Sequence, residues 1–195
     1  DWVNKFEKEG TYKETFTDIN GDESEIDFMH QVTNVQYYEN GDTKAVKLPY
    51  ENGLSMVVVL GDTKNILNDI HNNKMTSKLV DVSLPKFKAE YSIDYVNILK
   101  NMGIEKAFDN QNADFSLMLE NYPERIKIDS VLQKAMIDVD EKGTEAAAAT
   151  VAVLTKSALS VDEEVIEFRA DKPFTYYILD DSGNVYFAGR YVKAE

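Results

Sequence analysis

The chain has 195 residues and a formal net charge of −14 at pH 7, because 35 aspartates and glutamates outnumber 21 lysines and arginines. This acidity disfavours polyanionic partners, so we expect neither a nucleic acid nor a membrane surface as a partner. The absence of cysteine excludes disulfides, thiolate metal sites and a cysteine nucleophile. Hydrophobic residues make up 43% of the chain, enough for one sizeable core, and the longest apolar run, Met56–Leu60, has only the length of a strand.

The first third of the chain has the pattern of an antiparallel meander. The pairs Asn40-Gly41 and Asn52-Gly53 favour tight hairpin turns, and they separate segments rich in β-branched and aromatic residues. The segments expected to form strands are Thr15–Ile19, Ile26–Met29, Val32–Tyr38, Lys44–Tyr50 and Leu54–Leu60. The last three of these would pair with one another in sequence order.

Helical and extended patterns alternate in the rest of the chain. Asp62 is expected to cap a helix that carries apolar residues at Ile66 and Ile70, and Gly103 is expected to end a second helix that begins near Tyr91. The other expected strands are Val80–Lys88, Ile126–Val139, Phe174–Leu179 and Val185–Phe187. Together these elements predict a β-rich α+β fold with two to three helices.

Familiar catalytic and cofactor-binding motifs are missing from the sequence. The glycines are scattered singly, so they cannot form a phosphate-binding loop, and no G-x-S-x-G motif positions a serine nucleophile. His30 and His71 have no partner at a metal-binding spacing. The acidic residues are spread as on a solvated surface and define no carboxylate pair for an unrelated enzyme. We therefore expect no enzymatic activity, no metal and no cofactor.

The segment Glu141–Ser157 is unusually rich in alanine and threonine. The helix propensity of alanine, with Thr144 as a cap, favours a helix. If the segment is a strand instead, one of its faces carries only small or apolar side chains, which would let it slide between two existing strands. That face comprises Thr144, Ala146, Ala148, Thr150, Ala152 and Leu154. The residues alone leave both structures open.

The chain resembles the serpins over essentially its whole length, and it looks like a prokaryotic-type member of that family. Glu141–Thr150 is similar to the hinge at the base of the serpin reactive loop, and Phe168–Phe174 is similar to the signature that follows the loop. Further matches, in the order in which the family has them, are Val46–Tyr50, Leu84–Phe87, Leu99–Ile104, Ala107–Phe108 and Ala113–Ser116. So many matches in order make the resemblance specific.

The resemblance implies a fold and a place for the loop. The chain would be the C-terminal half of the serpin fold, with antiparallel sheets B and C, part of the central sheet A and two to three helices. Residues 1–195 would form a single partial domain, and the reactive loop would span about residues 141–165. The hinge residues implied are Glu141, Lys142, Gly143, Thr144, Glu145, Ala146, Ala147, Ala148, Ala149 and Thr150.

The resemblance also implies a function. Serpins inhibit serine proteases as suicide substrates, because the cleaved loop inserts as a strand while the protease is held as an acyl-enzyme. The family's spacing from the hinge glycine places the reactive bond at Ser157–Ala158, with Lys156–Ser157 as the alternative. The first bond predicts an elastase-like or subtilisin-like target, and the second predicts a trypsin-like one. The small hinge residues favour an inhibitor over the alternative, a non-inhibitory serpin that acts as a binding or chaperone module.

Two features depart from a complete family member. Gln133, before Lys134, occupies a position where serpins often have histidine, and Trp2 resembles a tryptophan near the middle of the serpin fold. These three residues would lie in the region that controls opening of the sheet. About half of a serpin would precede Trp2, so the chain by itself is expected not to inhibit.

The resemblance further implies an incomplete central sheet. Its remnant, Val80–Lys88 with Ile126–Val139, would have an open edge, which proteins usually cover. We expect the hinge, the N-terminal half of the same protein or another chain to cover that edge. The family also implies an extracellular or cell-surface location.

Overall fold

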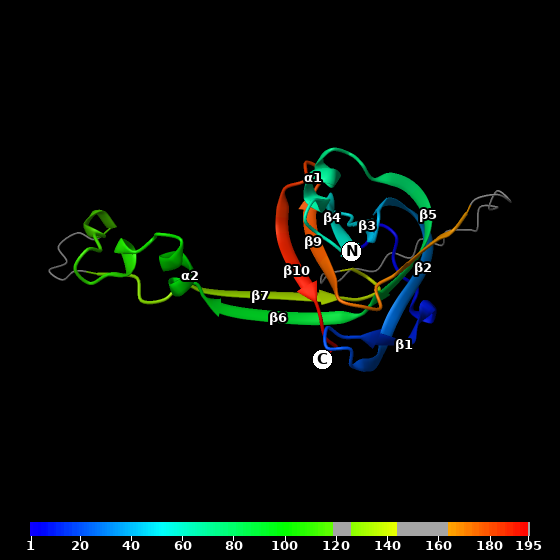
Figure 1. The fold of residues 1–195 in the computed structure, drawn as a ribbon, viewed down its shortest axis with the longest axis horizontal. Coiled ribbons are helices and arrows are strands. Elements are labelled where there is room, and N and C mark those ends of the chain that lie inside the picture. Colours follow the sequence, from blue (N-terminus) through cyan, green and yellow to red (C-terminus); the bar gives the residue numbers. More distant parts are fainter. Residues whose placement is uncertain (119–125, 144–163, 195) are drawn as a thin grey trace. The chain divides into compact units, whose positions relative to one another are not determined.

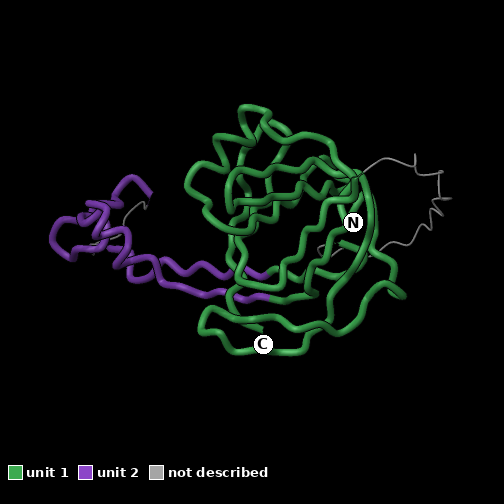
Figure 2. Tube along the Cα trace, turned by 45° about the vertical axis from the view of Figure 1, so that its right-hand side comes forward, with its two compact units in different colours: residues 1–88, 137–195 green, residues 89–136 purple. Residues whose placement is uncertain are grey.

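The structure, a computed structural model, describes residues 1–118, 126–143 and 164–194. The chain forms two compact units, of which the first contains residues 1–88 and 137–195 and the second contains residues 89–136 (Figure 2). The β-rich α+β architecture expected from the sequence is confirmed. The single partial domain stays a prediction.

An eight-stranded sheet dominates the first unit (Figure 1). Its strands follow the order β10-β9-β4-β3-β2-β5-β8, and β1 pairs with β2 outside this path. The pairings are antiparallel except that of β5 with β8, which is parallel, so the sheet is mixed. The strands are β1 (Thr11–Thr17), β2 (Glu23–Asn40), β3 (Thr43–Pro49), β4 (Leu54–Leu60), β5 (Thr76–Pro85), β8 (Ile166–Arg169), β9 (Phe174–Asp180) and β10 (Val185–Tyr191). The same unit contains the 3-10 helix η1 (Lys8–Gly10) and the α-helix α1 (Ile66–His71).

The predicted meander is confirmed, since β2, β3 and β4 pair as consecutive antiparallel strands. Gly41 and Gly53 have positive φ angles of 59° and 81°, which glycine adopts without a Cβ clash and which tight hairpin turns require. The two strands expected at Ile26–Met29 and Val32–Tyr38 are in fact one strand, β2, which is 18 residues long. It remains extended because it pairs with β5 along Phe28–Tyr37.

β4 lies at the centre of the core of the first unit. Residues Ser55–Val59 are buried on both faces of the sheet, as the continuous apolar run Met56–Leu60 predicts. On one face, Val57 and Val59 pack in a cluster with Ile66 of α1 and Leu179 of β9. Complete burial of such side chains contributes about 1.5–3 kcal/mol each, so this strand is a major source of stability.

The second unit contains most of a two-stranded sheet, β6 (Phe87–Asp94) with β7 (Leu132–Val139), whose strands run in opposite directions (Figure 1). It also contains the α-helix α2 (Val96–Asn101) and the 3-10 helices η2 (Lys106–Phe108) and η3 (Ser116–Met118). Gly103 ends the helical segment at a φ angle of 92°, as predicted. Among the described residues, no helix is long and apolar enough to span a membrane.

The strand expected at Val80–Lys88 is divided between two sheets. Pro85 ends β5, and Lys86 donates its N–H to the carbonyl oxygen of Asp27 before β6 begins at Phe87. A proline has no N–H to continue a ladder, so it is a natural place for the strand to leave the sheet. The two-stranded remnant therefore consists of β6 with β7, and Val80–Pro85 belongs to the larger sheet.

Two helix starts and one strand start also differ from the sequence prediction. Asp62 accepts the N–H of Lys64 instead of capping α1, which begins after Asn65. Asp94 accepts the N–H of Val96 at 3.0 Å and that of Val131 at 3.1 Å. This one carboxylate ends β6, so α2 begins at Val96 and not near Tyr91, and β7 begins only after Val131.

Gly189 in β10 provides a test of the packing in the first unit. A Cβ at this position would overlap the hydroxyl oxygen of Tyr176, whose ring is buried against Phe87 with 5.3 Å between ring centroids. We expect Gly189→Ala to lower the free energy of unfolding by about 1–3 kcal/mol, as overpacking does. Urea denaturation would measure this, with Ala188→Ser as the exposed control. Equal stability of the two variants would contradict the packing described.

Candidate functional site

The chain makes a tight turn directly after β7. The side-chain Oδ1 of Asp140 accepts the N–H of Lys142 at 2.8 Å and the N–H of Gly143 at 3.1 Å. The backbone of Asp140 and Gly143 closes the same turn, with the N–H of Asp140 donating to the carbonyl oxygen of Gly143 at 3.0 Å. Aspartate commonly bonds to backbone N–H groups two or three residues ahead, so the sequence favours this turn locally.

Gly143 is required where the turn meets the start of the chain. Its φ angle is 151°, and a Cβ would lie 2.7 Å from the Cα of Asp1. The backbone N–H of Trp2 donates to the carbonyl oxygen of Lys142 at 2.8 Å in the same place. The two backbones approach so closely that any larger residue at position 143 would force them apart.

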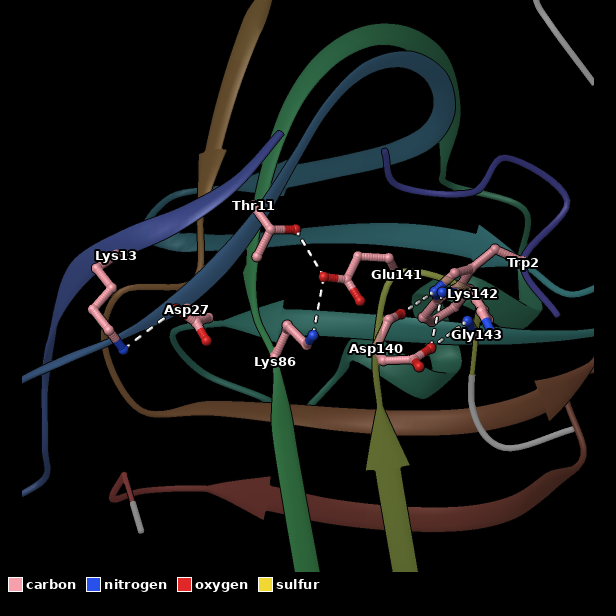
Figure 3. Close-up of polar contacts among 9 residues, drawn as sticks. All are labelled: Trp2, Thr11, Lys13, Asp27, Lys86, Asp140, Glu141, Lys142 and Gly143. Atoms are coloured by element: carbon pink, nitrogen blue, oxygen red, sulfur yellow. Dashed lines mark hydrogen bonds and ion pairs between the residues drawn. The ribbon is translucent and has the colours of Figure 1, made fainter. Parts of the chain in front are cut away.

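Trp2 covers this turn with its indole ring. The side chain is 1% exposed, and its Nε1–H donates to the carbonyl oxygen of Asp140 at 2.9 Å (Figure 3). The ring stacks on Tyr50, with 4.5 Å between centroids, and meets the edge of Phe6. Because the indole has a hydrogen-bond partner as well as apolar neighbours, it can be buried without an unsatisfied donor.

Glu141 places a carboxylate in the interior beneath the turn. The residue is only 6% exposed, and Oε1 accepts hydrogen bonds at 3.0 Å from both the hydroxyl of Thr11 in β1 and the Nζ of Lys86 (Figure 3). Its backbone carbonyl oxygen accepts the N–H of Phe6. Burial alone would raise the pKa of Glu141, but its own backbone N–H, Lys86 and Thr11 favour the charged form, and together they lower that pKa.

These contacts form one polar centre, which we call the hinge anchor. It joins the start of the chain, β1, the β5–β6 junction and the end of β7. Its residues are Trp2, Thr11, Lys86, Asp140, Glu141, Lys142 and Gly143. Its chemistry is structural, because a carboxylate saturated by donors is poorly suited to act as a general base.

The structure brings some of the predicted site residues together. Glu141, Lys142 and Gly143 form the hinge anchor together with Trp2. Gln133 and Lys134 are exposed on β7 in the other unit. The remaining hinge residues, Thr144–Thr150, and the candidate reactive-bond residues Lys156, Ser157 and Ala158 lie outside the described residues.

Sequence reasoning missed three members of the hinge anchor: Thr11, Lys86 and Asp140. Asp140 could have been found, because its spacing to Gly143 is typical of an aspartate turn. Lys86 lies 55 positions from Glu141, and no local pattern pairs them. Within the described parts of the chain, no group of three or more histidines, aspartates or glutamates could hold a metal ion.

The chain is similar to proteins of one family. Residues 1–194 match the family model described as Serpin (serine protease inhibitor). An uncharacterized serpin-like protein of Methanosarcina mazei is 37% identical, with 97% of this chain and 46% of that protein covered. The native thermophilic serpin tengpin superposes with a TM-score of 0.83 at 29% identity, over 100% of this chain and 53% of tengpin. Serpin48 of the insect Tenebrio molitor superposes with a TM-score of 0.79 at 31% identity, over 100% and 53%. The chain thus spans about half the length of the relatives it matches.

Lys86 allows a direct test of the hinge anchor. Lys86→Ala would leave the Glu141 carboxylate buried without its cation, so we expect the free energy of unfolding to fall by about 1–3 kcal/mol. Lys13→Ala is the matched control, since Lys13 pairs with Asp27 at 3.3 Å on the surface and both side chains are at least half exposed (Figure 3). The control should leave stability unchanged in urea denaturation, because exposed ion pairs contribute little. Similar losses in both variants would contradict the anchor.

The lowered pKa of Glu141 predicts a pH dependence of stability. The folded state binds this proton less tightly than the unfolded state, whose pKa is near the ordinary 4.5. The stabilisation that charged Glu141 gives to the folded state is therefore fully present above that value. It is lost as the pH falls through the pKa of Glu141 in the folded state. Glu141→Gln should remove this part of the acid destabilisation, measured as the change in urea midpoint between neutral and acidic pH. Asp27→Asn, on the surface, should keep the original profile, and an unaltered profile in Glu141→Gln would refute the assignment.

Proposed function

Because this chain belongs to the serpin family, we propose that the whole protein inhibits a serine protease as a suicide substrate. The protease serine attacks the carbonyl carbon of Ser157, or of Lys156 in the alternative. The peptide bond breaks, an ester forms on the protease serine, and the protease histidine protonates the new amino terminus at Ala158 or Ser157. The loop segment N-terminal to the cut then inserts as a strand, and the ester is not hydrolysed because the protease is distorted.

The hinge anchor is the observation that carries this proposal. An inserting segment needs a base that stays in place while the residues beyond it move. Glu141 and Gly143 are held by buried contacts to three other segments, and the small residues that begin at Thr144 follow directly. Among the described residues, β7 pairs only with β6, so its other edge is available to an incoming strand. In our proposal, Thr144–Thr150 pair there.

The proposal requires more than this chain. A serpin-type insertion needs a strand on each side of the loop, and the chain spans about half of its relatives. We therefore propose that these 195 residues do not inhibit by themselves. The N-terminal half of the same protein, or another chain, would cover the edge of β7. The extracellular or cell-surface location belongs to the same proposal and rests on the family alone.

The test uses the protein with a complete serpin fold. It would be mixed with elastase-like, subtilisin-like and trypsin-like serine proteases and examined on denaturing gels and by mass spectrometry. We expect a covalent complex that survives boiling and a released peptide that starts at Ala158, or at Ser157 in the alternative. Cleavage without a complex by all three classes would overturn inhibition and favour the non-inhibitory binding or chaperone module.

Two variants test insertion itself. Thr144→Arg places a charge on the face of small side chains, which would be buried when the segment inserts. We therefore expect cleavage with no complex, since burying an unpaired charge is costly. Glu145→Arg places the same charge on the opposite face and should keep complex formation. Equal yields of complex from the two variants would contradict insertion of this segment as a strand.

A further inference from the structure

β8 is the strand at which the described chain resumes after the loop, and it lies at one end of the sheet order. It has four residues, and it pairs in parallel with β5 from Val80↔Ile166 to Ser83↔Arg169. Among the described residues, β5 is its only strand partner, and β8 ends the order of the sheet. A short parallel edge strand has few ladder hydrogen bonds, so its side-chain contacts, which include the fully buried ring of Phe168, help to decide how firmly it is held.

Arg169 makes the polar side-chain contact that ties β8 to the rest of the sheet. Its Nη2 donates to Oε1 of Glu14 in β1 at 2.6 Å, and its Nη1 donates to Glu167 within β8 at 3.1 Å. The Glu14 side chain is 18% exposed, so this ion pair is partly shielded from water. This ion pair joins β8 to β1, although β5 and β2 stand between these two strands in the order of pairing.

His30 faces the same carboxylate oxygen. Its Nε2 lies 3.7 Å from Oε1 of Glu14, is buried and has no hydrogen-bond partner within the described part of the chain. Its ring stacks on Tyr12 with 4.2 Å between centroids. The register places His30 opposite Ser83, and Ser83 opposite Arg169, so these residues form one row across β2, β5 and β8. The hydroxyl of Ser83 donates a hydrogen bond to the other carboxylate oxygen of Glu14, Oε2, at 3.3 Å.

The charge of His30 depends on several groups around it. Burial lowers its pKa below the ordinary 6.5; Glu14 and Asp81 oppose this effect, and Arg169 adds to it. The folded state therefore favours neutral His30, and this arrangement loses stability as the pH falls below about 6.5. The groups that face His30 are Tyr12 and Glu14 of β1, Asp81 and Ser83 of β5, and Arg169 of β8, itself paired with Glu167.

We propose that Glu14, Arg169 and His30 form an acid-sensitive latch that holds β8 to the sheet at neutral pH and loosens it on acidification. When His30 is neutral, it does not compete with Arg169 for Oε1 of Glu14. Protonated His30 would donate to that oxygen and would repel the guanidinium, so Arg169 would lose its anchor. The latch itself does not depend on the proposed function. Only its consequence rests on that function, because β8 holds the C-terminal end of the loop that the protease would cut.

Hydrogen exchange on the 195-residue chain tests the latch without any protease. Peptides covering Ile166–Arg169 would be followed by mass spectrometry at about pH 7.5 and about pH 5.5, corrected for the intrinsic pH dependence of exchange. We expect β8 to open roughly tenfold more often at the lower pH, the change that the loss of one hydrogen bond between charged groups produces. Peptides from β4 and β9 should not change. An unchanged β8 would overturn the proposal.

Three variants assign the effect to the latch. His30→Gln stays uncharged and should remove the acid-induced opening. His71→Gln, at the only other histidine of the chain, should keep it. Glu14→Gln should open β8 at both pH values. Acid-induced opening that persists in His30→Gln, or protection at neutral pH that persists in Glu14→Gln, would overturn the proposal.

If His30→Gln loses protection throughout the sheet, a proton NMR titration of the unaltered chain replaces it. The His30 pKa should then coincide with the pH midpoint of β8 opening, and a mismatch would overturn the latch. Failure to trap a protease would overturn the proposed function and leave this result standing, so the two failures are distinguishable.

Discussion

One buried carboxylate joins the segments on which the candidate site depends. Glu141 follows β7 in the sequence, but its partners come from β1 and from the junction between β5 and β6. Removing a carboxylate from water is costly unless donors surround it, and Thr11, Lys86 and the backbone supply those donors. The base of the loop is therefore coupled to the packing of the larger sheet, and it cannot move without leaving a charge unpaired.

Sterics reinforce this electrostatic constraint. The start of the chain lies directly on the turn after β7, with Trp2 bonded to the turn by its backbone and its indole. Gly143 permits that approach because it has no Cβ. The buried ion pair thus holds Glu141, and the backbone contact with the start of the chain holds Lys142 and Gly143 directly after it. The hinge anchor thus fixes the residues that directly precede the segment for which insertion is proposed.

The two ends of the loop are held by different chemistry. At the base, a lysine neutralises a glutamate that is almost fully buried. At β8, an arginine that is 42% exposed shares its glutamate with a histidine. A histidine changes charge near neutral pH, whereas a lysine–glutamate pair remains charged there. The proposed latch would therefore make the two ends respond differently to acidification.

The sequence by itself determined the features that depend on local backbone preferences and short periods. The two Asn-Gly turns, the buried strand β4 and the stop at Gly103 follow from such patterns and were found correctly. The ordered motifs identified the family. Only the tertiary structure decided that β2 is one continuous strand, that Pro85 separates two sheets, and that Glu141 meets Lys86. The row of His30, Ser83 and Arg169 likewise appears only in the folded sheet. Such contacts join residues far apart in the chain, and they follow from the register between strands, which no local pattern specifies.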